Sequence, residues 1–316
     1  MRVFHTAAEI GPGFGPSAVT IGKFDGVHSG HRAVIDRLVR EARAAGLTST
    51  VVTFDRNPLE VIAPERCPDA LVSLDQKLDL LSETGVDATL VVHFDAAFAA
   101  IPADRFVTEY LVAALHARRV YVGSDFRFGK GNLGDVALLR ELGAARGFTV
   151  ELIDDVVGSA GERVSSTRIR QLLAEGDIAE AQRLLGHEPM LRGVVVHGAK
   201  RGRELGFPTA NLSPQSEGLI PADGVYAGWL IDNGVRYPAA ISVGNNPTFE
   251  GVPQKQVEAH VIGESVGGFD LYDHEVEVSF AARIRGMVAF EGIPALIAQI
   301  AADVRTAREL LGVPAA

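Results

Sequence analysis

The stretch Val19-Thr20-Ile21-Gly22-Lys23-Phe24-Asp25-Gly26-Val27-His28-Ser29-Gly30-His31 decides the fold of the first half of the chain. A short apolar run leads into a turn punctuated by glycines, and a helix-like pattern follows. Glycine allows backbone N–H groups to come close to a ligand. His28 and His31 flank the expected start of the helix, where unpaired N–H groups favour an anion. The stretch therefore predicts a phosphate site, although a capped turn with two surface histidines would have the same pattern.

The composition is that of an ordinary globular protein. Of its 316 residues, 47% are hydrophobic and 22% are charged, and the formal net charge is −10. The length favours two domains, and the negative charge argues against nucleic acid as a partner. A single cysteine, Cys67, excludes an internal disulfide and suits a reducing compartment. No apolar run approaches the ~18 residues of a membrane span. We expect a cytoplasmic protein with neither a membrane nor a nucleic-acid partner.

Strand-like and helix-like segments alternate through residues 1–186. Strands are expected at 18–21, 50–54, 88–93, 119–123 and 149–153, and helices at 33–45, 74–84, 103–115, 136–146, 167–174 and 176–185. This alternation predicts a mostly parallel sheet with helices on both faces. Ligands bind beyond the carboxyl ends of the strands in such sheets, which is where the histidine turn would lie.

After Gly186 the pattern changes. His187-Glu188-Pro189 is typical of a linker. Strand-like runs without intervening helices follow at 190–197, 224–231, 237–243, 256–262 and 275–283. Their spacing predicts a small antiparallel barrel, and apolar positions at helical spacing in residues 294–311 predict one covering helix. The sequence thus divides into domains 1–186 and 187–316.

Three further segments of the first domain carry polar and aromatic residues. Ser165-Ser166-Thr167-Arg168 stands at an expected helix start. Its hydroxyls could simply cap the helix, but an arginine in a first turn opposes the helix dipole unless an anion is near, and a triphosphate would supply one. Residues 53–58 and 123–129 follow strands and mix phenylalanine with carboxylates. That mix suits a flat heterocycle with a polar tail, although the two phenylalanines of 123–129 could equally belong to the core.

Two sets of motifs resemble a known family. GKFDGVHSGH (22–31) and VSSTRIR (164–170) resemble the nucleotidylyltransferase module of bifunctional prokaryotic FAD synthetases. GVVVHGAKRGRELGFPTANL (193–212) resembles the ATP loop of riboflavin kinase, with GNNPTF (244–249) and VEAH (257–260) after it. The resemblance covers nearly the whole chain in the family's order. It implies a Rossmann-like nucleotidylyltransferase domain and a riboflavin kinase-like barrel. These would convert riboflavin to FMN and FMN to FAD with ATP as co-substrate.

The resemblance implies roles for residues of the adenylyltransferase half. His28, His31 and Arg168 would be catalytic, holding the ATP phosphates and neutralising pyrophosphate. The other implied ATP-binding residues are Gly22, Phe24, Asp25, Gly26, Gly30, Ser165, Ser166 and Thr167. The implied flavin-binding residues are Phe54, Asp55, Asn57, Pro58, Asp125, Phe126 and Phe128. Because the FMN phosphate is already an anion, this reaction needs no strong base, and the barrier comes from bringing two anions together.

The kinase half has a neutral nucleophile, the riboflavin hydroxyl, which must lose a proton. By resemblance the base is Glu258, and Thr209 and Asn211 would hold Mg²⁺ together with phosphates and water. The implied ATP-binding residues are Gly198, Lys200, Gly202, Arg203, Gly206, Pro208, Thr209 and Asn211, and the implied flavin-binding residues are Asn246, Glu258 and Arg285. Without the resemblance, Thr209 and Asn211 would pass for turn chemistry and Glu258 for a solvent-facing strand residue.

The chain departs from the family pattern at several positions. Arg56-Asn57 stands where Pro-His is frequent, Ile62 where an aromatic is frequent, and Asp125 where asparagine is also common. Met287-Val288-Ala289 replaces charged residues. These changes bear on flavin affinity and on the relative rates of the two reactions. The alternative functions are a monofunctional adenylyltransferase or kinase and a non-enzymatic flavin-binding regulatory protein. The oligomeric state stays open, with a transient homo-oligomer among the options.

Overall fold

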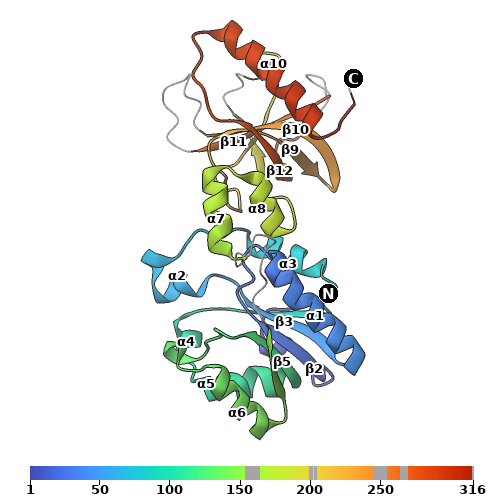
Figure 1. The fold of residues 1–316 in the computed structure, drawn as a ribbon, viewed down its shortest axis with the longest axis vertical. Coiled ribbons are helices and arrows are strands. Elements are labelled where there is room, and N and C mark those ends of the chain that lie inside the picture. The colour runs from blue at the N-terminus through green and yellow to red at the C-terminus, as the bar shows by residue number, and fades with distance from the viewer. Residues whose placement is uncertain (154–163, 199–201, 203–204, 245–254, 264–269, 315–316) are drawn as a thin grey trace. The chain divides into compact units, whose positions relative to one another are not determined.

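The structure is a computed structural model of the full chain. It describes residues 1–153, 164–198, 202, 205–244, 255–263 and 270–314. The chain separates into two compact units (Figure 1). The first unit consists of Met1–Ala70 and Leu74–Ser165, and the second consists of Leu71–Ser73 and Ser166–Ala316. The predicted boundary after residue 186 lies further along the chain and stays a prediction. None of the helices in the described ranges is long and apolar enough to cross a membrane.

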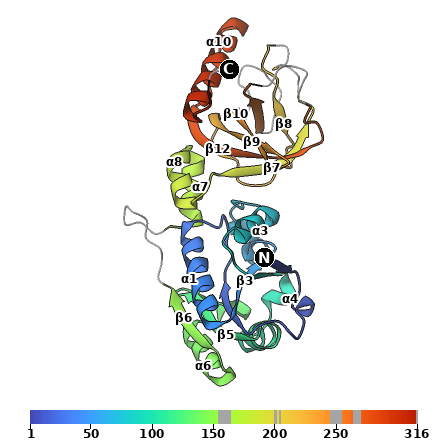
Figure 2. The same cartoon turned by 90° about the vertical axis from the view of Figure 1, so that its right-hand side faces the viewer.

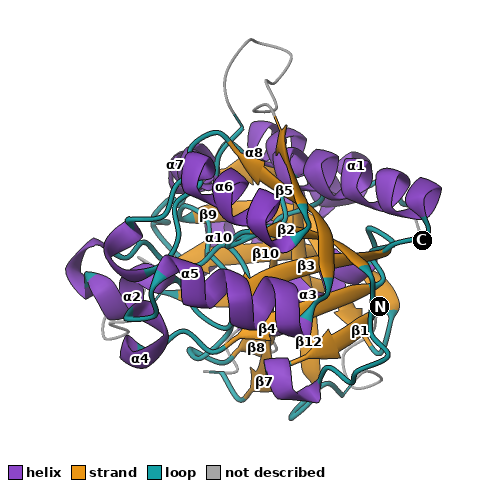
Figure 3. Cartoon of the chain, turned by 90° about the horizontal axis from the view of Figure 1, so that it is seen from below, coloured by secondary structure: helices purple, strands orange, loops and turns teal. Residues whose placement is uncertain are grey.

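A six-stranded sheet forms the first unit, and Figure 3 distinguishes its strands from the helices by colour. The strands are β1 (Arg2–Phe4), β2 (Ser17–Ile21), β3 (Thr48–Phe54), β4 (Ala88–Val92), β5 (Ala117–Gly123) and β6 (Thr149–Ile153). Their order is β1-β4-β3-β2-β5-β6, and every pair is parallel. The predicted parallel sheet is confirmed. The sequence missed only β1, because three residues are too few to show a periodicity.

The helices of this unit connect the strands. They are α1 (Ser29–Ala45), α2 (Pro58–Ile62), α3 (Leu74–Ser82), α4 (Ala96–Ala99), α5 (Ala103–Phe106), which continues as the π-helical η3 (Val107–Ala114), and α6 (Val136–Arg146). Short 3-10 turns are η1 (Ala7–Glu9), η2 (Pro64–Arg66) and η4 (Lys130–Asn132). Right-handed crossovers in this strand order place α1 and α3 on one face and η3 and α6 on the other.

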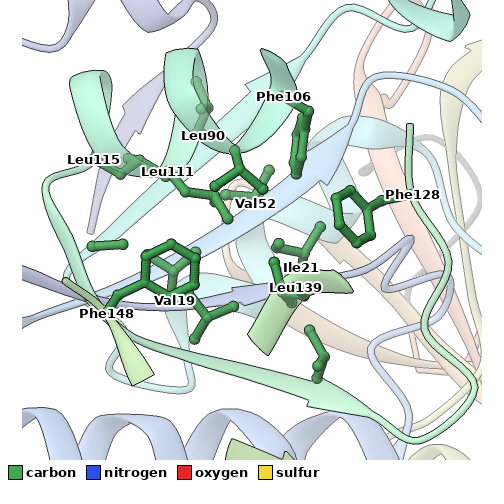
Figure 4. Packing of buried hydrophobic residues seen from close by; sticks show 14 of the residues in the cluster. Val19, Ile21, Val52, Leu90, Phe106, Leu111, Leu115, Phe128, Leu139 and Phe148 are labelled. Atoms are coloured by element: carbon green, nitrogen blue, oxygen red, sulfur yellow. The ribbon is translucent and has the colours of Figure 1, made fainter. Parts of the chain in front are cut away.

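The core on the second face is shown in Figure 4. Val19 and Val52 of the sheet pack there with Leu111 of η3, Leu139 of α6 and Phe128 of the loop after β5. Strands β2 and β4 are buried at every position. Continuous apolar strands of this kind are expected when a parallel sheet is covered on both faces.

The strand order reverses between β2 and β5. The connection from β2 leads to β3 on one side, and the connection from β4 returns across the sheet to β5 on the other. The loops that follow β2 and β5 therefore diverge at the carboxyl edge of the sheet. A crevice at such a switch point is where open α/β sheets bind ligands.

The second unit contains a closed antiparallel barrel. Its strands are β7 (Met190–Val196), β8 (Ala210–Leu212), β9 (Gly224–Asp232), β10 (Val235–Gly244), β11 (Gln256–Val261) and β12 (Glu275–Arg285), in the order β10-β11-β8-β7-β12-β9. The predicted barrel is confirmed, with the three-residue β8 as an additional strand. The predicted covering helix is α10 (Ile293–Leu310), which packs along β9, β10 and β12 (Figure 2). Helices α7 (Ser166–Glu175) and α8 (Ile178–Leu185) pack together, and α8 contacts β12.

Candidate functional site

The loop after β2 places two histidines at the start of α1. His28 is the N-cap of α1, and its Nδ1 accepts a hydrogen bond from the backbone N–H of His31 at 3.3 Å. In the neutral ring this assigns the proton to Nε2, which becomes a donor. The two imidazoles stack with centroids 3.6 Å apart. At Gly30 an added Cβ would lie only 3.2 Å from the His28 ring, so glycine permits this stacked arrangement.

The backbone that leads to these histidines is strained. Phe24 has φ 48° and Val27 has φ 39°, and both side chains are buried. Left-handed φ values are rare for bulky and β-branched residues. The ring of Phe24 meets His31 edge-on, with centroids 5.1 Å apart. Strain of this kind concentrates at functional sites, where the surrounding packing enforces a conformation that function requires.

His31 is held neutral. Burial lowers its pKa well below the usual value, and electrostatic interactions with His28, Lys23 and Lys77 lower it further. Its Nδ1 is buried and has no hydrogen-bond partner among the described residues. A buried polar atom without a partner is costly, and an oxygen or hydroxyl of a ligand would satisfy it.

A cavity of about 770 Å³ opens beyond the carboxyl ends of β2, β3, β4 and β5. The predicted residues that line it are Gly22, Phe54, Asn57, Pro58, Asp125, Phe126 and Phe128. Phe128 also belongs to the core and Phe126 packs against it, so both interpretations of these rings hold. The cavity is large enough for a drug-sized ligand, and an apolar lining with a few polar groups is typical of such sites.

An array of aromatic rings runs along this cavity. Phe94 meets Phe54 and Phe98 edge-on, each with centroids 5.4 Å apart, and Phe126 stacks on Phe128 at 5.5 Å. Phe98 continues the array to Phe106. The sequence analysis missed three of these residues, Phe94, Phe98 and Phe106. Phe94 directly follows β4, so the rule that ligands bind at strand ends could have found it, whereas Phe98 and Phe106 resemble ordinary core positions of helices.

Asp55 is not among the residues that line the cavity. Its carboxylate accepts a hydrogen bond from the Phe94 backbone N–H at 2.9 Å and pairs with His93 Nδ1 at 2.7 Å. Burial alone would raise the pKa of Asp55, but these hydrogen bonds and the neighbouring Arg56 lower it below its usual value. Asp55 therefore ties the end of β3 to the end of β4.

The departure Arg56-Asn57 has a local structural consequence. Asn57 caps α2, because its Oδ1 accepts from the Leu59 backbone N–H at 3.2 Å while Glu60 accepts from the Asn57 N–H at 3.2 Å. This reciprocal capping box stabilises the start of the helix that carries Pro58 into the cavity wall.

Arg168 belongs to the other unit. Ser165 ends the first unit, and Ser166 begins α7 in the second. The Arg168 guanidinium lies 4.0 Å from Glu175 at the other end of α7. The proposed contacts of residues 165–168 with ATP stay predictions.

A second cavity, of about 220 Å³, lies in the barrel unit. The predicted residues that line it are Gly198, Gly202, Pro208, Thr209, Asn211, Glu258 and Arg285. Gly206 does not line it, and Lys200, Arg203 and Asn246 lie outside the described residues.

The short strand β8 brings the polar residues of this cavity together. Its antiparallel pairing with β11 sets Asn211 directly opposite Glu258. Thr209 Oγ1 donates to Glu258 Oε2 at 3.3 Å, and Asn211 Nδ2 donates to Thr209 Oγ1 at 3.2 Å. Gly198 lies against this pair so closely that an added Cβ would overlap the Asn211 side chain. The cavity thus holds a carboxylate, a hydroxyl and an amide in mutual contact.

The sequence analysis quoted His260 within a motif but assigned it no role. It follows Glu258 by two residues on β11, so both side chains point to the same face and both line the cavity. Burial lowers the pKa of His260, although its hydrogen bond with the Pro208 carbonyl, 2.8 Å from Nδ1, acts in the opposite direction. The neutral ring donates from Nδ1 and holds the segment that carries Thr209.

Arg285 is anchored by a residue of α10. Its Nε and Nη2 donate to the Asp303 carboxylate at 3.0 and 2.6 Å, and its Nη1 donates to the Gly286 carbonyl at 3.0 Å. Gln299 also donates to Asp303, at 2.8 Å. The guanidinium is therefore used to join β12 to α10 beside the cavity.

Known families match both halves of the chain. A family model described as FAD synthetase matches residues 14–168, and one described as riboflavin kinase matches residues 185–311. A bifunctional riboflavin kinase/FMN adenylyltransferase of Escherichia coli K12 is 41% identical over 295 residues, which cover 93% of this chain and 92% of that protein. The chain belongs to the bifunctional riboflavin kinase/FMN adenylyltransferase family.

Other relatives support this membership. A bifunctional riboflavin kinase/FMN adenylyltransferase of Haemophilus influenzae is 36% identical and covers 98% of this chain and 97% of its own. A crystal structure of a protein from Streptococcus pneumoniae, described as a macrolide-efflux protein, has the same fold with a TM-score of 0.84 at 32% identity, over 97% of this chain and 98% of that one.

As a member of this FAD synthetase family, the protein has riboflavin kinase and FMN adenylyltransferase activities. The predicted bifunctional enzyme is confirmed at this level. ATP, riboflavin and FMN are the substrates that membership implies.

Proposed function

We propose that Glu258 is the base of the riboflavin kinase reaction and that His28 and His31 hold the ATP phosphates during FMN adenylylation. The first proposal is supported by the contact of Glu258 with Thr209 in the barrel cavity. The second is supported by the cap geometry of His28 and the buried, unpartnered Nδ1 of His31.

In the kinase step the riboflavin 5′-hydroxyl oxygen attacks the γ-phosphorus of ATP. The bond from that oxygen to phosphorus forms, the bond from phosphorus to the ADP oxygen breaks, and the hydroxyl proton passes to the Glu258 carboxylate. Thr209 and Asn211 present hydroxyl and amide oxygens beside Glu258, and hard oxygen donors of this type suit Mg²⁺. When bound, Mg²⁺ would offset the negative charge of the phosphates.

In the adenylylation step a phosphate oxygen of FMN attacks the α-phosphorus of ATP and pyrophosphate leaves. No proton needs to be removed from the nucleophile, so donors rather than a base are required. Nε2 of His28 and the N-terminus of α1 supply such donors, and a neutral His31 can supply one more. The aromatic array beside this turn offers flat apolar surfaces for the isoalloxazine ring.

The observation that carries the proposal is the convergence of Thr209, Asn211 and Glu258. Thr209 and Glu258 lie 49 positions apart in the sequence, yet a hydrogen bond joins them within one cavity. The register of β8 and β11 brings them together. We also propose a cytoplasmic location, which the single cysteine supports.

Two variants, one in each proposed site, test these roles in the full-length protein. With riboflavin, ATP and Mg²⁺, His28→Ala should accumulate FMN and form FAD at least about 100-fold more slowly, because a transition-state donor is lost. Glu258→Ala should lose FMN formation by roughly 10²–10⁴-fold and still convert supplied FMN to FAD. Flavins are separated by chromatography.

The matched controls are His5→Ala and Glu275→Ala, both at exposed positions, which should retain both activities. Equal loss of FMN and FAD formation in either test variant would contradict two independent sites.

A further inference from the structure

Lys77 is a buried lysine that the roles proposed above do not use. It lies on α3, and only 8% of its surface is exposed. Its Nζ donates to the carbonyl of Phe54 at 3.0 Å. Among the residues that the structure describes, this neutral carbonyl is its only hydrogen-bond partner, and no carboxylate forms an ion pair with it. An ammonium with three donors thus has a single partner among the described residues.

This ammonium lies at the carboxyl edge of the sheet. Phe54 is the last residue of β3 and lines the cavity of about 770 Å³. The charge of Lys77 acts on His31, whose pKa it helps to lower. Lys77 thus holds the end of the strand that carries Phe54 and acts electrostatically on the turn that carries His31.

The burial of Lys77 makes its charged form energetically unfavourable. Burial lowers its pKa, and the carboxylates of Asp25, Asp55 and Glu60 oppose this effect from a distance. Asp55 and Glu60 are already engaged with the ends of β4 and α2. A buried charge that lacks a contacting counter-ion destabilises the fold, and such groups are concentrated where a site needs the charge.

We propose that Lys77 is a positioning residue for FMN adenylylation, which fixes the carboxyl end of β3 and supplies a permanent positive charge beside the phosphate-binding turn. The inference rests on the proposed role of His28 and His31. ATP and FMN bring several negative charges to this edge of the sheet. A cation in a partly dehydrated site attracts them more strongly than one in water. The anion, once bound, is the counter-ion that the ammonium lacks in the unliganded protein.

The test compares Lys77→Met with Lys77→Arg in the full-length protein. Methionine keeps the length of the side chain without the charge, whereas arginine keeps the charge. FAD formation is measured from supplied FMN and ATP, together with inhibition by pyrophosphate, a product of the adenylyltransferase alone. Riboflavin kinase activity of the same sample and the thermal unfolding midpoint report on the fold. Arg43→Met, at the exposed end of α1, removes the same charge about 20 Å from the turn and serves as the control.

Lys77→Met should slow FAD formation by roughly tenfold to 100-fold and raise the inhibition constant of pyrophosphate about tenfold. Kinase activity should stay unchanged, and the unfolding midpoint should stay within about 3 °C of wild type, because losing a buried charge offsets the lost hydrogen bond. Lys77→Arg should recover most of the FAD rate, and Arg43→Met should match wild type.

The proposal is overturned if Lys77→Met forms FAD within about threefold of the wild-type rate, a difference of under 1 kcal/mol in the barrier. It is equally overturned if Lys77→Met unfolds or loses kinase activity, since Lys77 would then be a structural residue, or if Lys77→Arg is impaired as much as Lys77→Met. A wild-type protein that makes FMN and no FAD would instead refute the proposed function.

Discussion

Replacing Asp303 by asparagine should loosen the barrel unit and weaken its kinase site. Asp303 is only 4% exposed and accepts hydrogen bonds from Arg285 and Gln299. Asparagine has nearly the same size but no charge, and its NH₂ group would face the donors of the guanidinium. Arg285 would then be left in a largely buried position without its counter-ion.

The magnitude follows from the burial of the pair. Breaking a fully buried ion pair by removing one partner costs about 3–5 kcal/mol. The Arg285 side chain is 20% exposed and keeps its bond to the Gly286 carbonyl, so we expect a loss of about 3 kcal/mol, at the lower end of that range. For a unit of about 150 residues this lowers the unfolding midpoint by roughly 6–12 °C. Because Arg285 and Asp303 both line the cavity, the KM for riboflavin should rise about tenfold, equivalent to roughly 1.4 kcal/mol of binding.

Thermal inactivation of the two activities in one sample provides the assay. In Asp303→Asn the kinase should be inactivated at a lower temperature than in wild type. FAD formation from supplied FMN should be affected less, because the parallel sheet and the histidine turn belong to the first unit. Asp273→Asn is the matched control, because Asp273 is exposed and its φ of 63° is tolerated by asparagine. The reasoning is refuted if Asp303→Asn costs less than about 1 kcal/mol. It is also refuted if Arg285→Met combined with Asp303→Leu is as destabilising as the sum of the single changes, since removing both charges should be cheaper.

Two further outcomes are expected. Gly198→Ala should lower riboflavin kinase activity about 100-fold, because the added methyl displaces Asn211. FAD formation from FMN should not change, and Gly13→Ala, whose methyl meets nothing within 4 Å, should retain both activities. The stability of the first unit should fall as the pH drops below about 6.5, by up to about 1.4 kcal/mol per pH unit. The lowered pKa of His31 means that the unfolded chain binds a proton there before the folded chain does. Denaturant titrations of wild type and His31→Gln at pH 5 and pH 7 give the free energy of unfolding at each pH. An equal change in this free energy between the two pH values in both proteins would contradict the prediction.

The sequence by itself determined the two architectures, and its resemblance to a known family predicted the two reactions. Buried apolar runs separated by amphipathic helices are compatible with a parallel sheet covered on both faces, and β2 and β4 have this form. The stretch from Val19 to His31 similarly contained its own strand, turn and helix cap. Such local patterns are readable because they depend on neighbours a few residues apart.

Tertiary structure decided which residues meet. The contact between Thr209 and Glu258 depends on the register of β8, whose three residues show no periodicity. The ion pair of Arg285 with Asp303 joins a strand to a helix 18 positions away, and the bond from Lys77 to Phe54 joins a helix to the end of an earlier strand. In each case a charged or polar side chain is placed by the packing of elements distant in sequence, and burial then sets its energy. A sequence records that a lysine or an aspartate is present, and only the fold removes water from around it.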